Sequence, residues 1–169
     1  MRLVDLTLVL PFLPLVILLS VYLGPNQRNV TLVLTLASWA GPARLIRSRV
    51  LALLSEPYVE AAHALGCSLP RILLLHIWPG VRFIAFVQLM LVASASILAE
   101  ASLSFLGLGD PSAKSWGTTL YFARASGAFL GNAWLWWVLP PGLMITLTVL
   151  SMVLIGYTME EVLEPALHP

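Results

Sequence analysis

The sequence predicts an all-α, polytopic membrane protein of about four spanning helices, with a cytoplasmic helix-turn-helix loop between the second and third. Apolar residues make up 59% of the 169 residues and charged residues only 10%, whereas a soluble domain carries about 25% charged residues. The mean hydropathy is +0.92. The apolar stretches run without alternation, which is typical of helices in lipid. So few charges cannot cover a water-facing surface, so lipid must surround much of this chain.

Charged residues divide the chain into apolar runs, each of which we expect to be a membrane span. The predicted spans cover residues 6–24, 29–46, 83–106 and 137–159. The first run lacks a signal-peptide cleavage site, and we expect a retained helix bent by Pro11 and Pro14. The last run begins near Pro140 and Pro141, because proline is tolerated in the first turn of a helix.

Basic residues predict the orientation of these spans. They gather around the loop 47–82, as Arg44, Arg47, Arg49, Arg71 and Arg82. The opposite segments hold Arg28, Lys114 and Arg124. Loops rich in Lys and Arg stay on the cytoplasmic side, so the loop 47–82 and both termini of this chain are predicted to be cytoplasmic. The tryptophans at 134, 136 and 137 suit the opposite membrane–water interface.

The loop 47–82 is predicted to contain two short helices of its own. Ser55 can cap the first helix, with Pro57 in its first turn, and Gly66 can supply a left-handed stop. Ser68 can cap the second helix, which Pro79 ends or bends.

One side of the first loop helix carries residues suited to a contact. At helical spacing this side holds Tyr58, Ala61, Ala62 and Leu65, with Glu60 at its edge. The alanines permit close approach by another backbone. These residues fit an amphipathic loop on the membrane surface or a docking helix for a cytoplasmic partner.

The loop also resembles a known motif. Glu60, Ala61 and Ala62, followed by Gly66 and then Pro79, resemble the EAA loop of bacterial ABC importer permeases, in spacing as well as in kind. Trp78 departs from the family's usual leucine. Further segments resemble the dipeptide/oligopeptide/nickel branch of these permeases, namely residues 1–5, 38–39, 43–47, 71–79, 99–109, 115–117 and 141–143.

This resemblance implies one transmembrane permease domain over residues 1–169, corresponding to the C-terminal portion of the family's domain. Such permeases lie in the bacterial cytoplasmic (inner) membrane and normally carry two more helices before the point where Met1 falls. We therefore expect a fragment or a start codon assigned too late, in preference to a naturally short subunit. In the family a separate binding protein selects the solute; peptides are favoured here, with nickel chelates and glutathione-like compounds open.

The resemblance also implies the partners. The EAA loop of the family fits a cleft on an ATP-binding cassette subunit, and the residues carried over to that contact are Tyr58, Glu60, Ala61, Ala62, Gly66 and Pro79. The other implied partners are a second, homologous permease subunit, an extracytoplasmic solute-binding protein and membrane lipid. No GxxxxGK loop occurs, so ATP belongs to the partner and no cofactor is expected here. The net charge of +1 favours no nucleic acid.

Glu100 is the acidic residue expected at the end of the third span. A carboxylate in a membrane is costly and often functional. It can be structural, bonded to Ser102, Ser104 or a helix N-terminus, or it can line the pathway. No catalytic site is expected, because the serines lack a base, and no metal site, because His63 and His76 lie on different helices. The alternatives to transport are an intramembrane enzyme using Glu100 and a purely structural helical bundle.

Overall fold

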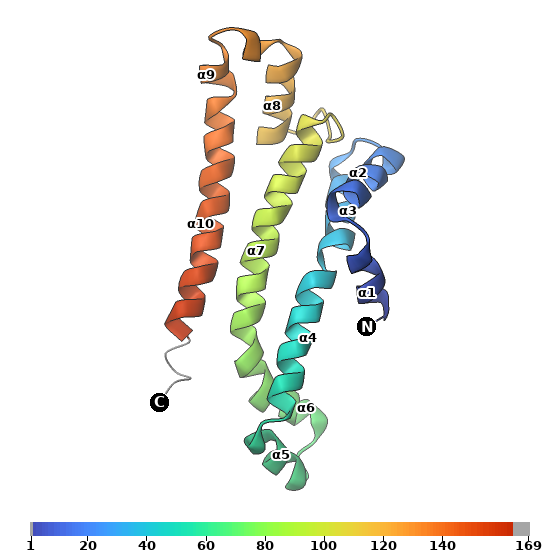
Figure 1. Cartoon of the computed structure of the whole chain (residues 1–169), viewed down its shortest axis with the longest axis vertical. Helices are drawn as coiled ribbons and strands as arrows, with labels where there is room; N and C mark the ends of the chain where they lie inside the picture. Colours follow the sequence, from blue (N-terminus) through green and yellow to red (C-terminus); the bar gives the residue numbers. More distant parts are fainter. Residues whose placement is uncertain (1, 164–169) are drawn as a thin grey trace.

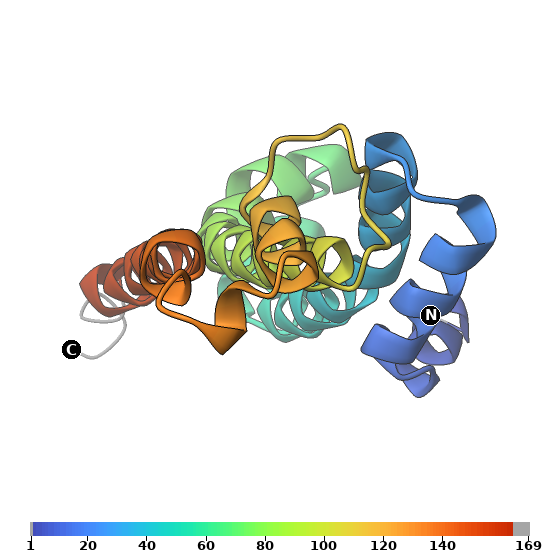
Figure 2. The same cartoon turned by 90° about the horizontal axis from the view of Figure 1, so that it is seen from above.

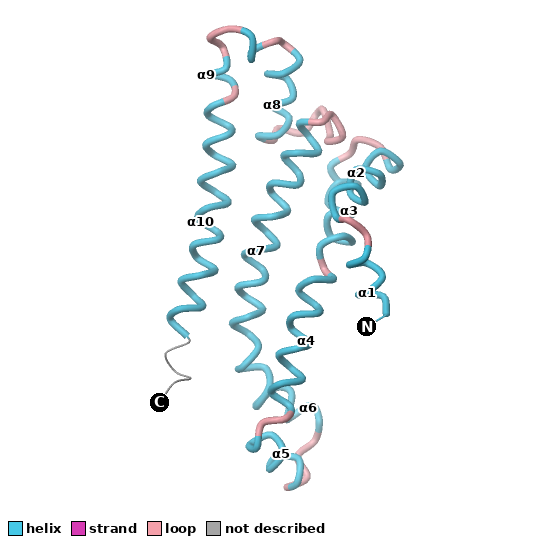
Figure 3. Tube along the Cα trace, viewed as in Figure 1, coloured by secondary structure: helices cyan, strands magenta, loops and turns pink. Residues whose placement is uncertain are grey.

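The computed structural model describes residues 2–163, with side chains described as far as residue 159. The described chain is helical and contains no strand, which confirms the predicted all-α class (Figure 3). Its elements are α1 (Arg2–Val9), α2 (Phe12–Leu23), α3 (Gln27–Ser38), α4 (Ala40–Leu54), α5 (Pro57–Ala64), α6 (Leu69–Ile72), the π-helical turn η1 (Leu73–Ile77), α7 (Trp78–Phe105), α8 (Trp116–Ala125), the 3-10 turn η2 (Ala128–Leu130), α9 (Trp134–Trp137) and α10 (Leu139–Leu163).

Two helical segments are each long and apolar enough to cross a membrane, Leu69–Phe105 and Trp134–Met159. They overlap the predicted third and fourth spans and run side by side (Figure 1). Gly156 of α10 lies against α7, where a Cβ would meet the Cβ of Met90 at 3.5 Å. Figure 2, seen from the end that carries α8 and α9, shows α10 on one side of α7 and α1 to α3 on the other.

The first predicted span is broken rather than gently bent. The axes of α1 and α2 differ by 89° across the break at Leu10 and Pro11, and only as a pair do they qualify as a third span. Proline disfavours helical backbone in the residue before it, so the helix stops ahead of Pro11. Pro14 falls in the first turn of α2, where no intrahelical N–H bond is lost.

The second predicted span is also divided, into α3 and α4, with Trp39 between them. Within the described chain neither helix alone is both long and apolar enough to span, so a fourth span stays a prediction. The helix α4 continues past residue 46 to Leu54, and it packs along α7. Part of the predicted loop is therefore one arm of a helical hairpin.

Of the two outcomes predicted for Pro79, that it ends or bends the second loop helix, the structure contradicts the first. The chain is helical from Leu69 to Phe105. In η1 the N–H of Trp78 donates to the carbonyl of Leu73, five residues back. This wider turn accommodates Pro79, which has no N–H and whose ring crowds the preceding turn. Residues 55–68, which include α5, connect α4 to this long helix.

The predicted serine caps were also wrong in detail. Ser55 lies at the end of α4, where its Oγ donates to the carbonyl of Ala52 at 2.8 Å, and Glu56 is the residue before α5. Ser68 does precede α6, but its side chain makes no capping bond. Backbone hydrogen bonds and the buried side chains of Val59 and Ile72 stabilise the starts of α5 and α6 instead.

Two apolar clusters hold the hairpin and its neighbours. The first joins α2, α3 and α7 through Val16, Val30, Val33, Leu34, Ala99 and Leu103. The second lies at the other end and joins α4, α5, α6, η1 and α7 through Leu53, Val59, Ile72, Ile77 and Val81. We call this second set the tip cluster. Beyond the first cluster, α8 and α9 lie at the end of the molecule opposite α5 (Figure 1).

Candidate functional site

The short helix α5 stands at one end of the molecule, between the arms formed by α4 and by α6 to α7 (Figure 1). Pro57 occupies its first turn. At its other end Gly66 has φ +77°, as predicted. The N–H of Gly66 donates to the carbonyl of His63 at 3.0 Å, and that of Cys67 to the carbonyl of Ala62 at 3.1 Å. This pair of bonds is a Schellman motif, which fixes the direction of the chain as it leaves α5.

Buried side chains anchor α5 to both arms. Val59 is 3% exposed and belongs to the tip cluster with Leu53 of α4 and Ile72 of α6. The arms approach closely at Gly80, where a Cβ would lie 2.8 Å from Cδ1 of Leu53. One core therefore packs α5 against both α4 and the arm that continues into α7.

The other side of α5 is exposed. Tyr58, Glu60, Ala61 and Leu65 are exposed, with Tyr58 at 49% and Leu65 at 85%. Ala62, predicted to share this face, is instead buried at 7%. The face open to a partner therefore holds Tyr58, Glu60, Ala61 and Leu65, while Ala62 lets α5 pack closely on its own chain.

Tyr58 and His76 make a contact that the sequence did not reveal. Their rings stack, with centroids 6.3 Å apart and planes inclined by 26°. No local pattern indicates this contact, because the turn at Gly66 separates the two residues. The contact links the exposed face of α5 to η1. Pro79 lies just past η1, in α7, and shapes this arm rather than the exposed face.

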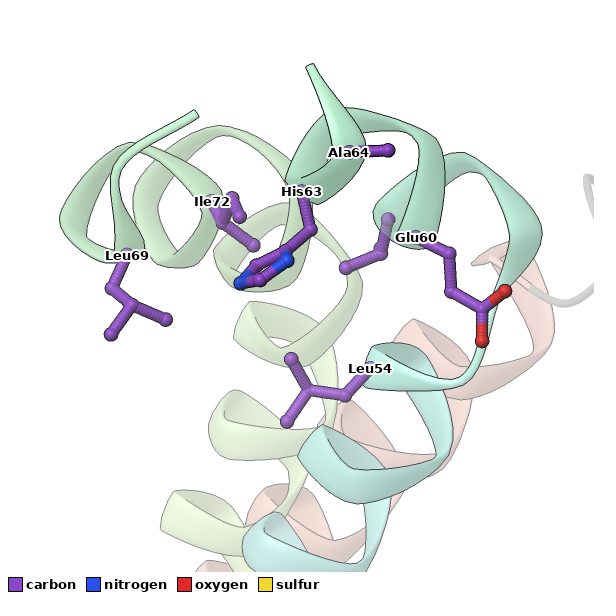
Figure 4. A pocket seen from close by; sticks show the side chains of 7 residues that line it. Leu54, Glu60, His63, Ala64, Leu69 and Ile72 are labelled. Carbon is purple, nitrogen blue, oxygen red and sulfur yellow. The ribbon is translucent and has the colours of Figure 1, made fainter. Parts of the chain in front are cut away.

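A groove of about 280 Å³ lies beside α5. Its lining residues are Leu54, Val59, Glu60, His63, Ala64, Leu69 and Ile72 (Figure 4). The ring of His63 points into the space between Leu54 and Leu69, and the Glu60 carboxylate lies at the edge (Figure 4). Within the described residues no group of three or more His, Cys, Asp or Glu side chains is placed to hold a metal ion. The groove is mainly apolar, and its polar groups are the Glu60 carboxylate and the His63 imidazole.

Glu100 lies in α7, toward the end opposite α5. The Oγ of Ser104 donates to Oε1 of Glu100 at 2.7 Å. This bond was expected if Glu100 has a structural role. Ser102 takes no part, because it is exposed and its Oγ donates to the carbonyl of Leu98 at 2.7 Å. Gly117 of α8 packs directly on this part of α7, where a Cβ would lie 2.7 Å from both Cα and O of Ala101.

Asp110, in the loop after α7, is a further polar residue that the sequence did not single out. Its Oδ1 accepts bonds from the N–H and Oγ of Ser112 at 2.9 and 2.6 Å, and its Oδ2 accepts the N–H of Gln27 at 3.4 Å. The bonds from the Ser112 side chain and backbone hold the pKa of Asp110 below its usual value. The carboxylate also stabilises the N-terminus of α3.

The fold and the α5 tip define a class, the multi-helix membrane protein with a short exposed helix held outside the main bundle. Comparison with known proteins is more specific. The chain belongs to the family described as binding-protein-dependent transport system inner membrane component, whose model matches residues 1–169.

Curated relatives agree with this family. The chain is 36% identical over 168 residues to the di/tripeptide transport system permease protein DppC of Pseudomonas aeruginosa, covering 99% of this chain and 54% of the relative. It is 36% identical over 173 residues to the dipeptide transport system permease protein DppC of Escherichia coli. That match covers 99% of this chain and 55% of the relative. The Bacillus subtilis protein of the same name is 33% identical over 169 residues, and the match covers 99% of this chain and 52% of the relative.

The chain thus spans about half the length of the curated relatives it matches. Family membership confirms the resemblance seen in the EAA loop and the polytopic helical membrane class. It also favours transport, and it gives no support to the intramembrane-enzyme alternative.

Proposed function

We propose that this chain is a membrane-spanning subunit of an ATP-driven importer, with α5 as the helix that a cytoplasmic ATP-binding cassette subunit grips. The observation that carries the proposal is the construction of the tip. An exposed face of Tyr58, Glu60 and Ala61 stands on a helix whose other side is buried in the tip cluster. Such a helix has a surface for a partner and cannot move independently of the arms below it.

The same construction supplies a mechanism for coupling. ATP is bound and hydrolysed on the partner, whose closure displaces α5. The Schellman turn at Gly66, the tip cluster and the Tyr58–His76 stack oppose bending within the tip. Displacement therefore passes into α4 and α7. Because α7 packs against α3, α8 and α10, the movement spreads through the membrane helices.

The transported solute is proposed to be a peptide or a related small molecule. The support comes from relatives named as dipeptide and di/tripeptide transport permeases. The pathway would form between this chain and a second, homologous permease, with an extracytoplasmic binding protein delivering the solute at the α8 and α9 end. Exposed apolar side chains along α10, such as Leu143, Leu147 and Leu154, suit lipid or a neighbouring membrane helix.

The proposed location is the bacterial inner membrane, with the α5 end in the cytoplasm. Arg47, Arg49 and Arg71 belong to the helices that flank α5, as expected for a cytoplasmic end. Trp134, Trp136 and Trp137 form α9 at the opposite end (Figure 1). The chain after residue 163 lies outside the described residues, so a cytoplasmic C-terminus stays a prediction, as does a cytoplasmic N-terminus.

The experiment that tests this proposal compares two glycines of similar conformation. Gly66 and Gly127 have φ of +77° and +72°, and a Cβ would meet no atom within 4 Å at either. Gly66→Asp should leave membrane insertion intact but abolish co-purification of the ATP-binding subunit. Gly127→Asp carries the same backbone strain near the opposite end and should retain the subunit. Recovery of the subunit at normal yield with Gly66→Asp would contradict the proposal.

A further inference from the structure

The long helix that leads from the tip into α7 contains one turn that is wider than an α-helical turn. In η1 the N–H of Trp78 donates to the carbonyl of Leu73, five residues back, whereas an α-helix joins residues four apart. The turn therefore holds one residue more than a regular turn. Compared with an uninterrupted α-helix, this extra residue rotates the helix before η1 by about 100° against the helix after it.

Burial on the two sides of η1 follows this wider turn. In an uninterrupted α-helix the residues one turn before Ile77 would be Leu73 and Leu74, four and three positions back. These two side chains are instead 48% and 67% exposed, whereas Ile72, five positions back, is 1% exposed. Ile72 and Ile77 both belong to the tip cluster, together with Val81. The extra residue thus brings Ile72 onto the same face as Ile77 and Val81.

The same turn determines the direction of the exposed face of α5. Ile72 packs with Val59 of α5 in the tip cluster, and His76 of η1 stacks on Tyr58. Both contacts join α5 to residues before or within the wider turn, whereas α7 begins after it. A rotation of Ile72 about the helix axis would therefore take α5 and its exposed face with it.

We propose that η1 is a positioning element, whose one extra residue sets the rotation of the tip about the axis of α7. In this way it directs the exposed face of α5 toward the ATP-binding subunit. The inference rests on the proposed coupling function and adds to it the element that aims the docking helix. It assigns the role to the number of residues in the turn, so the informative variants change that number.

Deletion of Leu74 isolates this role. Ile72 and Ile77 would then be four residues apart, so a regular α-helix places both on one face. The bond from the N–H of Trp78 to the carbonyl of Leu73 would persist as an ordinary α-helical bond. We expect the assembled complex to keep the ATP-binding subunit at close to the wild-type yield. The measurement is co-purification from membranes, with the yield normalised to the amount of permease.

The matched control is deletion of Leu51, another exposed leucine (53%), in the regular helix α4 of the other arm. That helix has no extra residue, so the deletion rotates its end, which carries Leu53 of the tip cluster, by about 100°. Co-purification of the ATP-binding subunit should fall to background. Retention of the subunit by this variant would overturn the inference, because the tip would then tolerate any change of rotation.

Pro79 supplies a rescue experiment, because its ring would crowd a regular turn. If deletion of Leu74 alone loses the ATP-binding subunit, adding Pro79→Ala to that variant should restore it. Adding Pro79→Ala to the Leu51 deletion should restore nothing. Loss of the subunit in the Leu74 deletion both with and without Pro79→Ala would overturn the inference. Failure of the wild-type complex to retain the subunit would instead overturn the proposed function.

Discussion

The ring of Tyr58 in α5 stacks on the ring of His76 in η1, with centroids 6.3 Å apart. Tyr58 belongs to the face proposed for the ATP-binding partner, whereas His76 lies in the π-helical turn that leads into α7. The stack therefore joins the contact surface to the arm by a path separate from the tip cluster.

Replacing His76 should weaken the grip of the ATP-binding subunit without unfolding the chain. His76→Ala removes the partner of the Tyr58 ring, and aromatic pairs contribute about 0.5–1.5 kcal/mol beyond their buried area. We expect a dissociation constant for the ATP-binding subunit raised by up to about tenfold, measured by reassembly of purified subunits. His76→Phe retains a stacking ring and should bind nearly as well as the wild type. Equal weakening by both variants would show that the stack contributes nothing specific.

Gly117 should tolerate no side chain. A Cβ there would lie 2.7 Å from backbone atoms of Ala101 and from Cβ of Ser104, so α8 would have to move away from α7. Overpacking of this kind costs about 1–3 kcal/mol. Gly117→Ala should lower the thermal unfolding midpoint of the detergent-solubilised protein. Gly142→Ala, in α10 where a Cβ meets nothing within 4 Å, is the control and should leave the midpoint unchanged or raise it. Similar shifts for both would exclude close packing as the cause.

The ionised carboxylate of Asp110 should stabilise the folded chain, and this contribution should be lost at acidic pH. Hydrogen bonds from Ser112 lower the pKa of Asp110 in the folded chain, so the charged carboxylate favours folding. This contribution is full above the ordinary carboxyl pKa, near 4, and is lost as the pH falls through the lowered value. Asp110→Asn should flatten the fall of the unfolding midpoint between about pH 5 and pH 3.

Asp5 offers the control for Asp110, because it is an exposed aspartate in α1. Asp5→Asn should keep the wild-type pH profile. A wild-type profile in Asp110→Asn as well would rule out the proposed contribution of the loop after α7.

Local sequence features predicted much of this structure. The long uncharged runs predicted α7 and α10, because a helix satisfies all of its backbone hydrogen bonds within one segment in lipid. Gly66 was identified as a left-handed stop from its place after a short helix. The spacing of Glu60, Ala61, Ala62 and Gly66 resembles the EAA loop of the family to which the chain belongs.

Other features depend on contacts that sequence patterns do not encode. Proline predicts a disturbance but not its size, so Pro11 accompanies a break of 89° while Pro79 follows a π-turn within a continuous helix. Ala62 was assigned to the outer face because helical spacing places it near the boundary between two faces, and packing against the arms decides on which side it lies. The Gln27–Asp110 bond joins residues 83 positions apart, so no local pattern indicates it.

The most direct test of the central claim is chemical labelling of α5 from each side of the membrane. An Ala61→Cys variant with Cys67→Ala carries its thiol on the exposed face of α5, and an Asn132→Cys variant carries it near α9. With a membrane-impermeant maleimide, the Asn132→Cys variant should be labelled in right-side-out vesicles, and the Ala61→Cys variant only in inside-out vesicles. Added ATP-binding subunit should protect the Ala61→Cys variant alone. Labelling of the Ala61→Cys variant from the outer side, or no protection by that subunit, would contradict α5 as the cytoplasmic docking helix.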